Sequence, residues 1–145
     1  MTDSNWLKIA LQLNGRGGAT ELAAEQPLAE TTAYWVHLDY TREESEQWLR
    51  RQSIPQAVID SLTAAETRPR ASEVAGGVLV YLRGVNLNPG ARPEDMIALR
   101  MWVGPRGLVS SQKRSLLSVD AVKGSLDSEQ GPASISALVA ELVDQ

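Results

Sequence analysis

The fold is decided by two nearby stretches, Ala65-Glu-Thr-Arg-Pro-Arg-Ala-Ser72 and Gly77-Val-Leu-Val-Tyr-Leu-Arg-Gly-Val-Asn86. Pro69 ends the helix predicted before it, because the residue preceding a proline is driven out of the α region. Residues 78–85 form a predicted strand that is apolar on both faces, which favours a central position in a sheet. A helix-to-strand junction of this kind indicates a domain that mixes helices with a sheet.

Arginines lie in or beside the apolar strands: Arg68, Arg70, Arg83 and Arg100. A buried guanidinium group is costly unless a carboxylate or carbonyl group meets it. The structural interpretation, which we favour, pairs these arginines with carboxylates of the same chain, the candidates being Glu66, Asp39 and Asp95. The functional interpretation assembles them into an anion-holding or subunit-contact patch.

Working outward, hydrophobic alternation predicts strands at 6–13, 34–39, 96–103 and 108–111. The last two are predicted to form a hairpin closed by 104–107, while 20–32 and 86–94 are predicted to be irregular connections. The fold class we expect is α/β (α+β), with a mixed, largely antiparallel sheet flanked by helices in a three-layer αβα arrangement.

Helices are predicted from their start signals and from their apolar spacing. Capping boxes at Thr41-Arg-Glu-Glu44 and Ser53-Ile-Pro-Gln56 predict two helices, and a third is expected over 116–126. A fourth begins at Gly131-Pro132. Its apolar residues, Ile135, Leu138, Val139 and Leu142, share one helical face. No glycine cap or basic last turn follows that helix, so we expect 1–145 to be a single domain cut from a longer chain.

Composition excludes several classes of protein. The chain has 145 residues, no cysteine, one histidine and a net charge of −4. Disulfides, thiolate metal sites and a multi-histidine zinc site within one copy are therefore ruled out, and an acidic chain is a poor partner for nucleic acid. No apolar run approaches the roughly 18 residues that span a bilayer. No signal peptide is recognisable, so we expect an intracellular soluble domain.

Candidate sites are few. His37 and Asp39 share one face of their predicted strand and are weak candidates for metal ligands, although a hydrogen-bonded structural histidine is the favoured interpretation. Gly15-Arg-Gly-Gly18 lacks the Gly-Lys-Ser/Thr ending of a phosphate loop, so a plain turn is expected there. With one histidine and no catalytic motif, we expect that the protein is not an enzyme and holds no tightly bound cofactor.

Eight short runs stand out in order along the chain: Leu13-Asn-Gly-Arg-Gly-Gly18, Trp35-Val-His-Leu-Asp-Tyr40, Gln47-Trp-Leu49, Thr67-Arg-Pro-Arg70, Leu82-Arg-Gly-Val-Asn86, Arg92-Pro-Glu-Asp95, Met96-Ile-Ala-Leu-Arg-Met101 and Val109-Ser-Ser-Gln-Lys-Arg114. In these runs and their order the sequence resembles the N-terminal cytoplasmic domain of the CorA family of divalent-cation transporters, closest to its zinc-transport branch. The resemblance covers about 11–126. It departs just before Thr67, where Ala65-Glu66 stands in place of the acid-then-serine pair frequent in such sequences.

The resemblance implies a homopentamer in an inner membrane, with this domain on the cytoplasmic side as the wall of a funnel. It also implies membrane-spanning helices beyond Gln145 and zinc or another divalent cation as the transported substrate. A free-standing intracellular regulatory module that binds a small anion or a metal ion is the alternative. Reading the gene beyond Gln145 would discriminate between the two.

Overall fold

The computed structural model describes residues 6–23, 27–52, 54–63, 70–74, 76–84, 97–112 and 117–144. Within these ranges, seven strands form one sheet in the order β2-β1-β3-β7-β6-β5-β4. The strands are β1 Leu7–Leu13, β2 Ala19–Glu21, β3 Tyr34–Asp39, β4 Arg70–Val74, β5 Gly77–Gly84, β6 Ile97–Val103 and β7 Gly107–Gln112. Neighbouring strands are antiparallel except for β3 and β7, which run parallel. The predicted mixed, largely antiparallel sheet is therefore confirmed.

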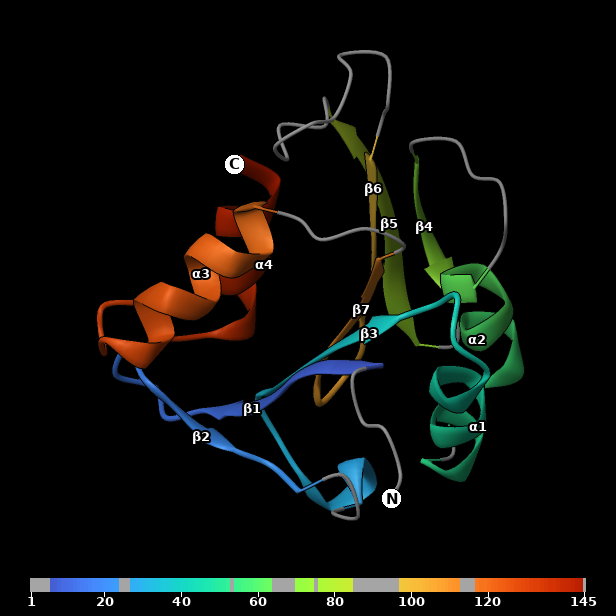
Figure 1. Ribbon diagram of the computed structural model, residues 1–145, viewed down its shortest axis with the longest axis horizontal. Helices are drawn as coiled ribbons and strands as arrows, with labels where there is room; N and C mark the ends of the chain where they lie inside the picture. Colours follow the sequence, from blue (N-terminus) through green and yellow to red (C-terminus); the bar gives the residue numbers. More distant parts are fainter. Residues whose placement is uncertain are drawn as a thin grey trace.

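Helices cover both faces of the sheet (Figure 1). They are α1 Glu43–Arg51, α2 Gln56–Thr63, α3 Leu117–Asp127 and α4 Ile135–Asp144. One hydrophobic core joins α1 and α2 to the sheet through Trp48, Leu49, Val58, Ile59 and Leu62. A second core joins α3 and α4 to the opposite face. Its helical members include Val122, Leu126, Leu138 and Leu142, so the expected apolar face of α4 is confirmed.

The parallel pair β3 and β7 occupies the middle of the sheet. All six residues of β7 are buried, and five of the six in β3 are. β5 is flanked by β4 and β6, so the prediction of an internal strand is confirmed, but it lies one strand from the edge of the sheet and its Val78 is 40% exposed. An apolar strand sequence shows that both faces can be covered, but it does not show how many strands lie on either side.

The connection predicted as irregular at 20–32 contains two short elements in its described part. β2 pairs with the end of β1, with Leu13 opposite Ala19, and the 3-10 helix Leu28–Glu30 follows. β4 was also missed by the sequence analysis, because five residues directly after Pro69 carry little periodicity.

Helix starts were the least accurate predictions. No side-chain hydrogen bond caps α1, whose N-cap residue is Arg42, so the capping box at Thr41 is wrong. The second box begins at Ser53, which lies outside the described residues. Helix α4 begins at Ile135 rather than at Gly131-Pro132, and the Ala137 amide donates to Ser134 Oγ at 3.1 Å. Ser134 therefore caps the N-terminus of α4, in place of the Gly131-Pro132 start that the sequence predicted.

Candidate functional site

The candidate site lies where the C-terminal end of α2 meets the sheet. Across β4, β5, β6 and β7, the directly paired residues are Arg70, Tyr81, Arg100 and Ser111. This single row brings two of the arginine positions singled out in the sequence, 70 and 100, onto strands separated only by β5. Arg83 lies two positions beyond Tyr81 on β5, opposite Ala98. Arg68 lies outside the described residues.

Three side chains of this row donate to carbonyl groups at the end of α2. Tyr81 Oη donates to Ser61 O at 2.6 Å, and Ser111 Oγ donates to Leu62 O at 2.8 Å. Arg100 Nη1 donates to Leu62 O at 3.2 Å. The last carbonyls of a helix lack partners within the helix and carry partial negative charge, so donors and a cation there are favourable. The row therefore caps α2 from three adjacent strands.

Arg100 is only 2% exposed. Its guanidinium carbon lies 4.1 Å from the centroid of the Tyr40 ring, within the range of a cation–π contact. Burial lowers the pKa of Arg100 from its usual value, although a guanidinium this basic keeps its charge. Among the described residues, Arg100 Nε has no hydrogen-bond partner. Within the described residues, the buried charge is thus met by a helix end and a ring face.

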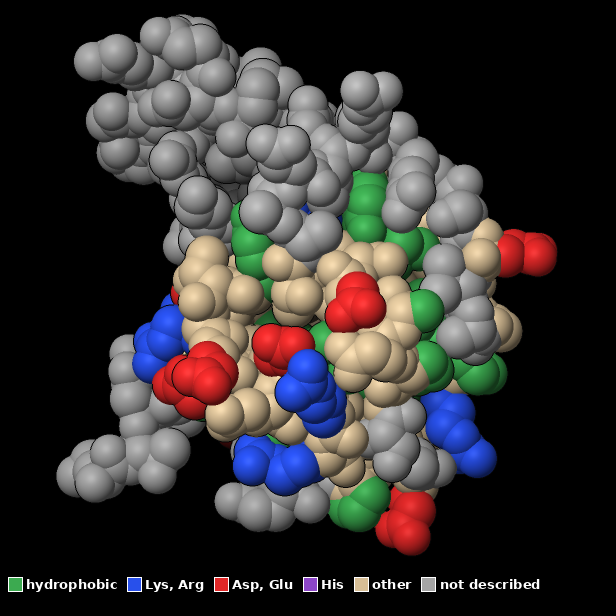
Figure 2. Space-filling model, turned by 90° about the vertical axis from the view of Figure 1, so that its right-hand side faces the viewer, with side chains coloured by type: hydrophobic (Ala, Val, Ile, Leu, Met, Phe, Trp, Pro, Cys, Tyr) green, Lys and Arg blue, Asp and Glu red, His purple; other side chains and the backbone are tan. Residues whose placement is uncertain are grey.

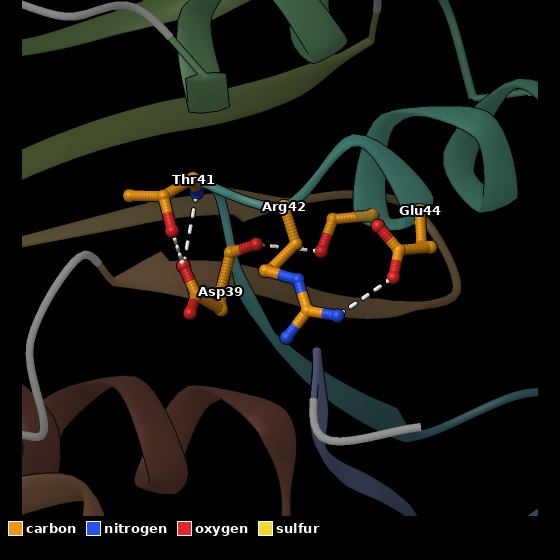
Figure 3. Close-up of polar contacts among 5 residues, drawn as sticks. Asp39, Thr41, Arg42 and Glu44 are labelled. Carbon is orange, nitrogen blue, oxygen red and sulfur yellow. Dashed lines mark hydrogen bonds and ion pairs between the residues drawn. The ribbon is translucent and has the colours of Figure 1, made fainter. Parts of the chain in front are cut away.

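The carboxylate partners expected for Arg100 were Glu66, Asp39 and Asp95. The first and last of these residues lie outside the described ranges. Asp39 uses its Oδ1 atom to accept from the Thr41 amide at 2.9 Å and from Thr41 Oγ1 at 2.6 Å (Figure 3). Ser45 Oγ donates to the Asp39 carbonyl at 2.6 Å, and Arg42 pairs with Glu44 at 2.8 Å. Asp39 therefore shapes the entry to α1.

This turn also explains why the predicted capping box fails. The Thr41 hydroxyl is directed back to Asp39 instead of forward to the first turn of α1. Aspartate accepting from the amide two residues ahead is a common turn geometry, and it competes with helix capping for the same threonine.

His37 is fully buried at the centre of the sheet and is hydrogen-bonded on both ring nitrogens. Nδ1 lies 2.7 Å from Ser110 Oγ, and Nε2 lies 2.7 Å from Gln112 Oε1. A carbonyl oxygen only accepts, so Nε2 carries the proton and Nδ1 accepts from Ser110. Trp35 Nε1 donates to the same Ser110 Oγ at 3.0 Å. Burial lowers the pKa of His37 to about 4, which keeps the imidazole neutral.

Both weak candidates for metal ligands therefore have protein partners, which favours structural roles for His37 and Asp39. Within the described ranges, no group of three or more His, Cys, Asp or Glu side chains is placed to hold a metal ion. The sequence carried one signal for the His37 network, namely the polar run Ser110-Ser-Gln112 at the end of an otherwise apolar strand. The part played by Tyr40 had no comparable signal.

The Gly15–Gly18 segment forms the turn between β1 and β2. Asn14 Oδ1 accepts from the amides of Arg16 and Gly18, at 2.8 and 3.1 Å. Gly15 and Gly17 have φ values of 79° and 92°, a region that glycine enters without strain. The plain turn expected from the sequence is confirmed. Across the described part of the chain, no helix has the length and apolarity needed to cross a bilayer.

The fold and the site together define an αβα domain with a mixed sheet and a buried arginine at a helix end. The model of the CorA-like Mg²⁺ transporter protein family matches residues 30–145. The chain belongs to this family. The predicted resemblance is thereby confirmed.

Relatives carry a more specific name. The zinc transport protein ZntB of Yersinia pseudotuberculosis is 33% identical over 136 residues, which cover 93% of this chain and 42% of that protein. ZntB of Klebsiella pneumoniae is also 33% identical, over 94% of this chain and 42% of its own length. The chain thus spans less than half the length of these relatives.

Solved structures agree on the fold. The full-length CmaX protein superposes with a TM-score of 0.87 at 36% identity, over 99% of this chain and 46% of that one. The ZntB cytoplasmic domain from Vibrio parahaemolyticus superposes with a TM-score of 0.85 at 24% identity, over 96% of this chain and 57% of that one. At that lower identity, the second likeness shows the fold alone.

Proposed function

We propose that this chain is the cytoplasmic domain of a divalent-cation transporter that moves zinc across an inner membrane. The observation that carries the proposal is the 33% identity to ZntB, which extends over 93% of the chain. The match to the CorA-like Mg²⁺ transporter family supports the divalent-cation part of the proposal, and zinc as the ion rests on the ZntB relatives alone.

In this proposal the domain does not select the ion. Zinc prefers nitrogen and sulfur ligands, and the one histidine of the chain is enclosed and neutral. Zinc is the transported substrate, and its selective ligands belong to the pore-forming part of the longer protein.

The domain acts instead as one wall of a funnel in a homopentamer and biases the opening of the pore. Its net charge of −4 would be multiplied fivefold around the axis and would attract divalent cations. Screening limits this attraction to about 8 Å at physiological ionic strength, so it acts only near the wall.

The test uses the complete protein encoded with this chain, reconstituted in vesicles, and a second form that lacks residues 1–145. Uptake of radioactive zinc is measured for both, with magnesium as the competing ion and with the oligomeric state checked in detergent. We expect pentamers for both forms, zinc flux in the complete protein and an altered dependence of flux on zinc concentration in the shortened one.

Two results would contradict the proposal. Unchanged zinc flux in a shortened protein that still assembles would remove the gating role. A coding region with no membrane-spanning segment, or a complete protein that moves no divalent cation, would favour the free-standing regulatory module instead.

A further inference from the structure

Asn14 and Gly15 stand in the turn between β1 and β2, and both are exposed. They form the one Asn-Gly pair in the sequence. Asparagine is thermolabile because the backbone nitrogen of the next residue can attack its side-chain carbonyl carbon and expel ammonia. Glycine permits this attack best, since it has no Cβ atom to shield its nitrogen and its backbone rotates freely. The pair therefore marks the side-chain amide of this chain that is most open to deamidation.

The surroundings of Gly15 leave room for the reaction. Its φ is 79°, and among the described residues a Cβ atom there would meet nothing within 4 Å. Ring closure needs the peptide between Asn14 and Gly15 to rotate until its nitrogen reaches Cγ of the asparagine. An exposed glycine in open space allows that rotation at little cost.

The turn also polarises the carbonyl group that is attacked. Asn14 Oδ1 accepts from the amides of Arg16 and Gly18, at 2.8 and 3.1 Å. Attack on Cγ places negative charge on Oδ1, and backbone N–H groups directed at an oxygen where charge develops lower the energy of the transition state. The fold thus supplies, at this amide, the kind of stabilisation that acyl-transfer sites use.

Side-chain amides of α1 and α2 lie in a different setting, on a surface where acidic and basic side chains are interspersed (Figure 2). Gln47 Nε2 donates to Glu43 at 3.3 Å, and Gln56 Nε2 donates to Asp60 at 2.8 Å, each across one turn of its helix. A glutamine side chain closes a six-membered ring, which forms more slowly than the five-membered ring of asparagine. These glutamines are therefore slow internal standards within the same molecule.

We propose that Asn14 is a site of spontaneous covalent modification, at which the chain converts to aspartate and isoaspartate. The Gly15 nitrogen forms a bond to Cγ and gives up its proton, the bond from Cγ to Nδ2 breaks, and ammonia leaves with that proton. One water molecule then opens the cyclic imide. Opening at Cγ gives aspartate, and opening at the backbone carbonyl carbon gives isoaspartate. Nothing is oxidised or reduced, and the reaction is independent of the proposed transport of zinc.

The two products affect the fold differently. Aspartate keeps the backbone, and its carboxylate can accept from the same two amides through charge-assisted hydrogen bonds. Isoaspartate routes the chain through Cβ and Cγ and so lengthens the turn by one atom. The turn is tightly packed on the loop between α3 and α4 (Figure 1): Gly17 O accepts from the Gly131 amide at 2.8 Å, and a Cβ atom at Gly17 would lie 2.9 Å from Glu129 O. We expect isoaspartate to break this contact.

The test is incubation of the folded protein in mildly alkaline buffer, followed by trypsin digestion and mass spectrometry. Cleavage after Lys8 and Arg16 releases residues 9–16, and fragment ions assign the added mass unit to Asn14 or to Gln12. We expect Asn14 to deamidate at least about tenfold faster than any other side-chain amide of the chain. The matched control is Gly15→Ala, whose Cβ atom shields the attacking nitrogen, and it should deamidate more slowly.

A second measurement tests the structural consequence. The isoaspartyl form is separated by chromatography from the aged protein, and its urea unfolding is compared with that of the unmodified protein and of Asn14→Asp. We expect the isoaspartyl form to unfold at a lower urea concentration, and Asn14→Asp to unfold close to the unmodified protein. The proposal is overturned if Asn14 gains mass no faster than the other amides, or if Gly15→Ala deamidates as fast as the wild type. An isoaspartyl form as stable as the unmodified protein overturns the proposed loss of the contact.

Discussion

At the scale of single residues, the fold stabilises a buried cation, Arg100, by placing the C-terminal end of α2 against it. Removing Arg100 from water costs several kcal/mol, and among the described residues the dipole of α2 and the ring of Tyr40 contribute to offsetting this cost. Tyr81 and Ser111 occupy the donor positions on either side, so the end of α2 is held even if Arg100 shifts. From the sequence alone, Arg100 could be recognised as needing a partner. That the partner is Leu62 O could not, because pairing between a strand and a helix terminus depends on tertiary register.

His37 gives the protein a stability that depends on pH. Its pKa is lowered from 6.5 to about 4 in the folded protein, so the unfolded chain binds the proton more readily. The contribution is present above pH 6.5 and is lost as the pH falls towards 4, amounting to about 3 kcal/mol. Urea unfolding from pH 7 to pH 4 should therefore show a steeper loss for the wild-type protein than for His37→Gln.

The comparison with His37→Gln isolates this one group, because the two proteins differ at that side chain alone. Parallel curves for the two proteins across that range would show that His37 has the same pKa in the folded and unfolded chains, as an imidazole open to solvent has. The quantity to compare is the slope of stability against pH, not the stability itself. The substitution also removes the His37 hydrogen bonds to Ser110 and Gln112, which changes stability at every pH.

At the scale of elements, two connecting segments far along the chain from each other are in contact. The turn between β1 and β2 packs on the loop between α3 and α4, and the Gly131 amide donates to Gly17 O at 2.8 Å. Glu129, with φ of 61°, ends α3 in a left-handed conformation. The amides of Glu129 and Gln130 then donate to Leu126 O and Ser125 O, which closes the helix where glycine is usual.

The substitution Gly17→Ala should be more destabilising than Gly15→Ala. Both positions have positive φ, so each substitution costs about 1 kcal/mol in backbone strain. A Cβ atom at Gly17 would also lie 2.9 Å from Glu129 O, whereas one at Gly15 would meet nothing within 4 Å. We expect an additional loss of about 1–3 kcal/mol for Gly17→Ala, measured by urea unfolding of both variants. Equal losses would mean that the two connections are not in contact in solution.

The elements also show which parts of a fold can be read from sequence. β3 was predicted with its exact bounds because six consecutive residues combine aromatic, β-branched and buried character. β2 was missed because three residues cannot display a period, and its existence depends on pairing with β1. The capping box at Thr41 failed because Asp39, two residues earlier, competes for the same hydroxyl.

At the scale of the whole molecule, composition and the alternation of elements were enough to predict the three layers, but not the strand order. The parallel pairing of β3 with β7 joins residues more than 70 positions apart, from Tyr34 with Gly107 to Asp39 with Gln112. Nothing local in either strand specifies that neighbour. The position of the candidate site follows from the same long-range order, since the row from Arg70 to Ser111 exists only once β4 to β7 are in register.

This strand order predicts how stability is distributed over the sheet. β7 is flanked by β3 and β6, and every one of its residues is buried, whereas β2 is a three-residue edge strand with Thr20 and Glu21 exposed. Amide groups in buried central strands exchange only on global unfolding, and those at edges exchange by local opening. We expect the amides of 108–111 to exchange with deuterium at least about a hundredfold more slowly than those of 19–21, measured by NMR at neutral pH. Because the two strands lie in one sheet, equal rates would mean that the sheet opens as a single unit, and the central position of β7 would then confer no separate protection.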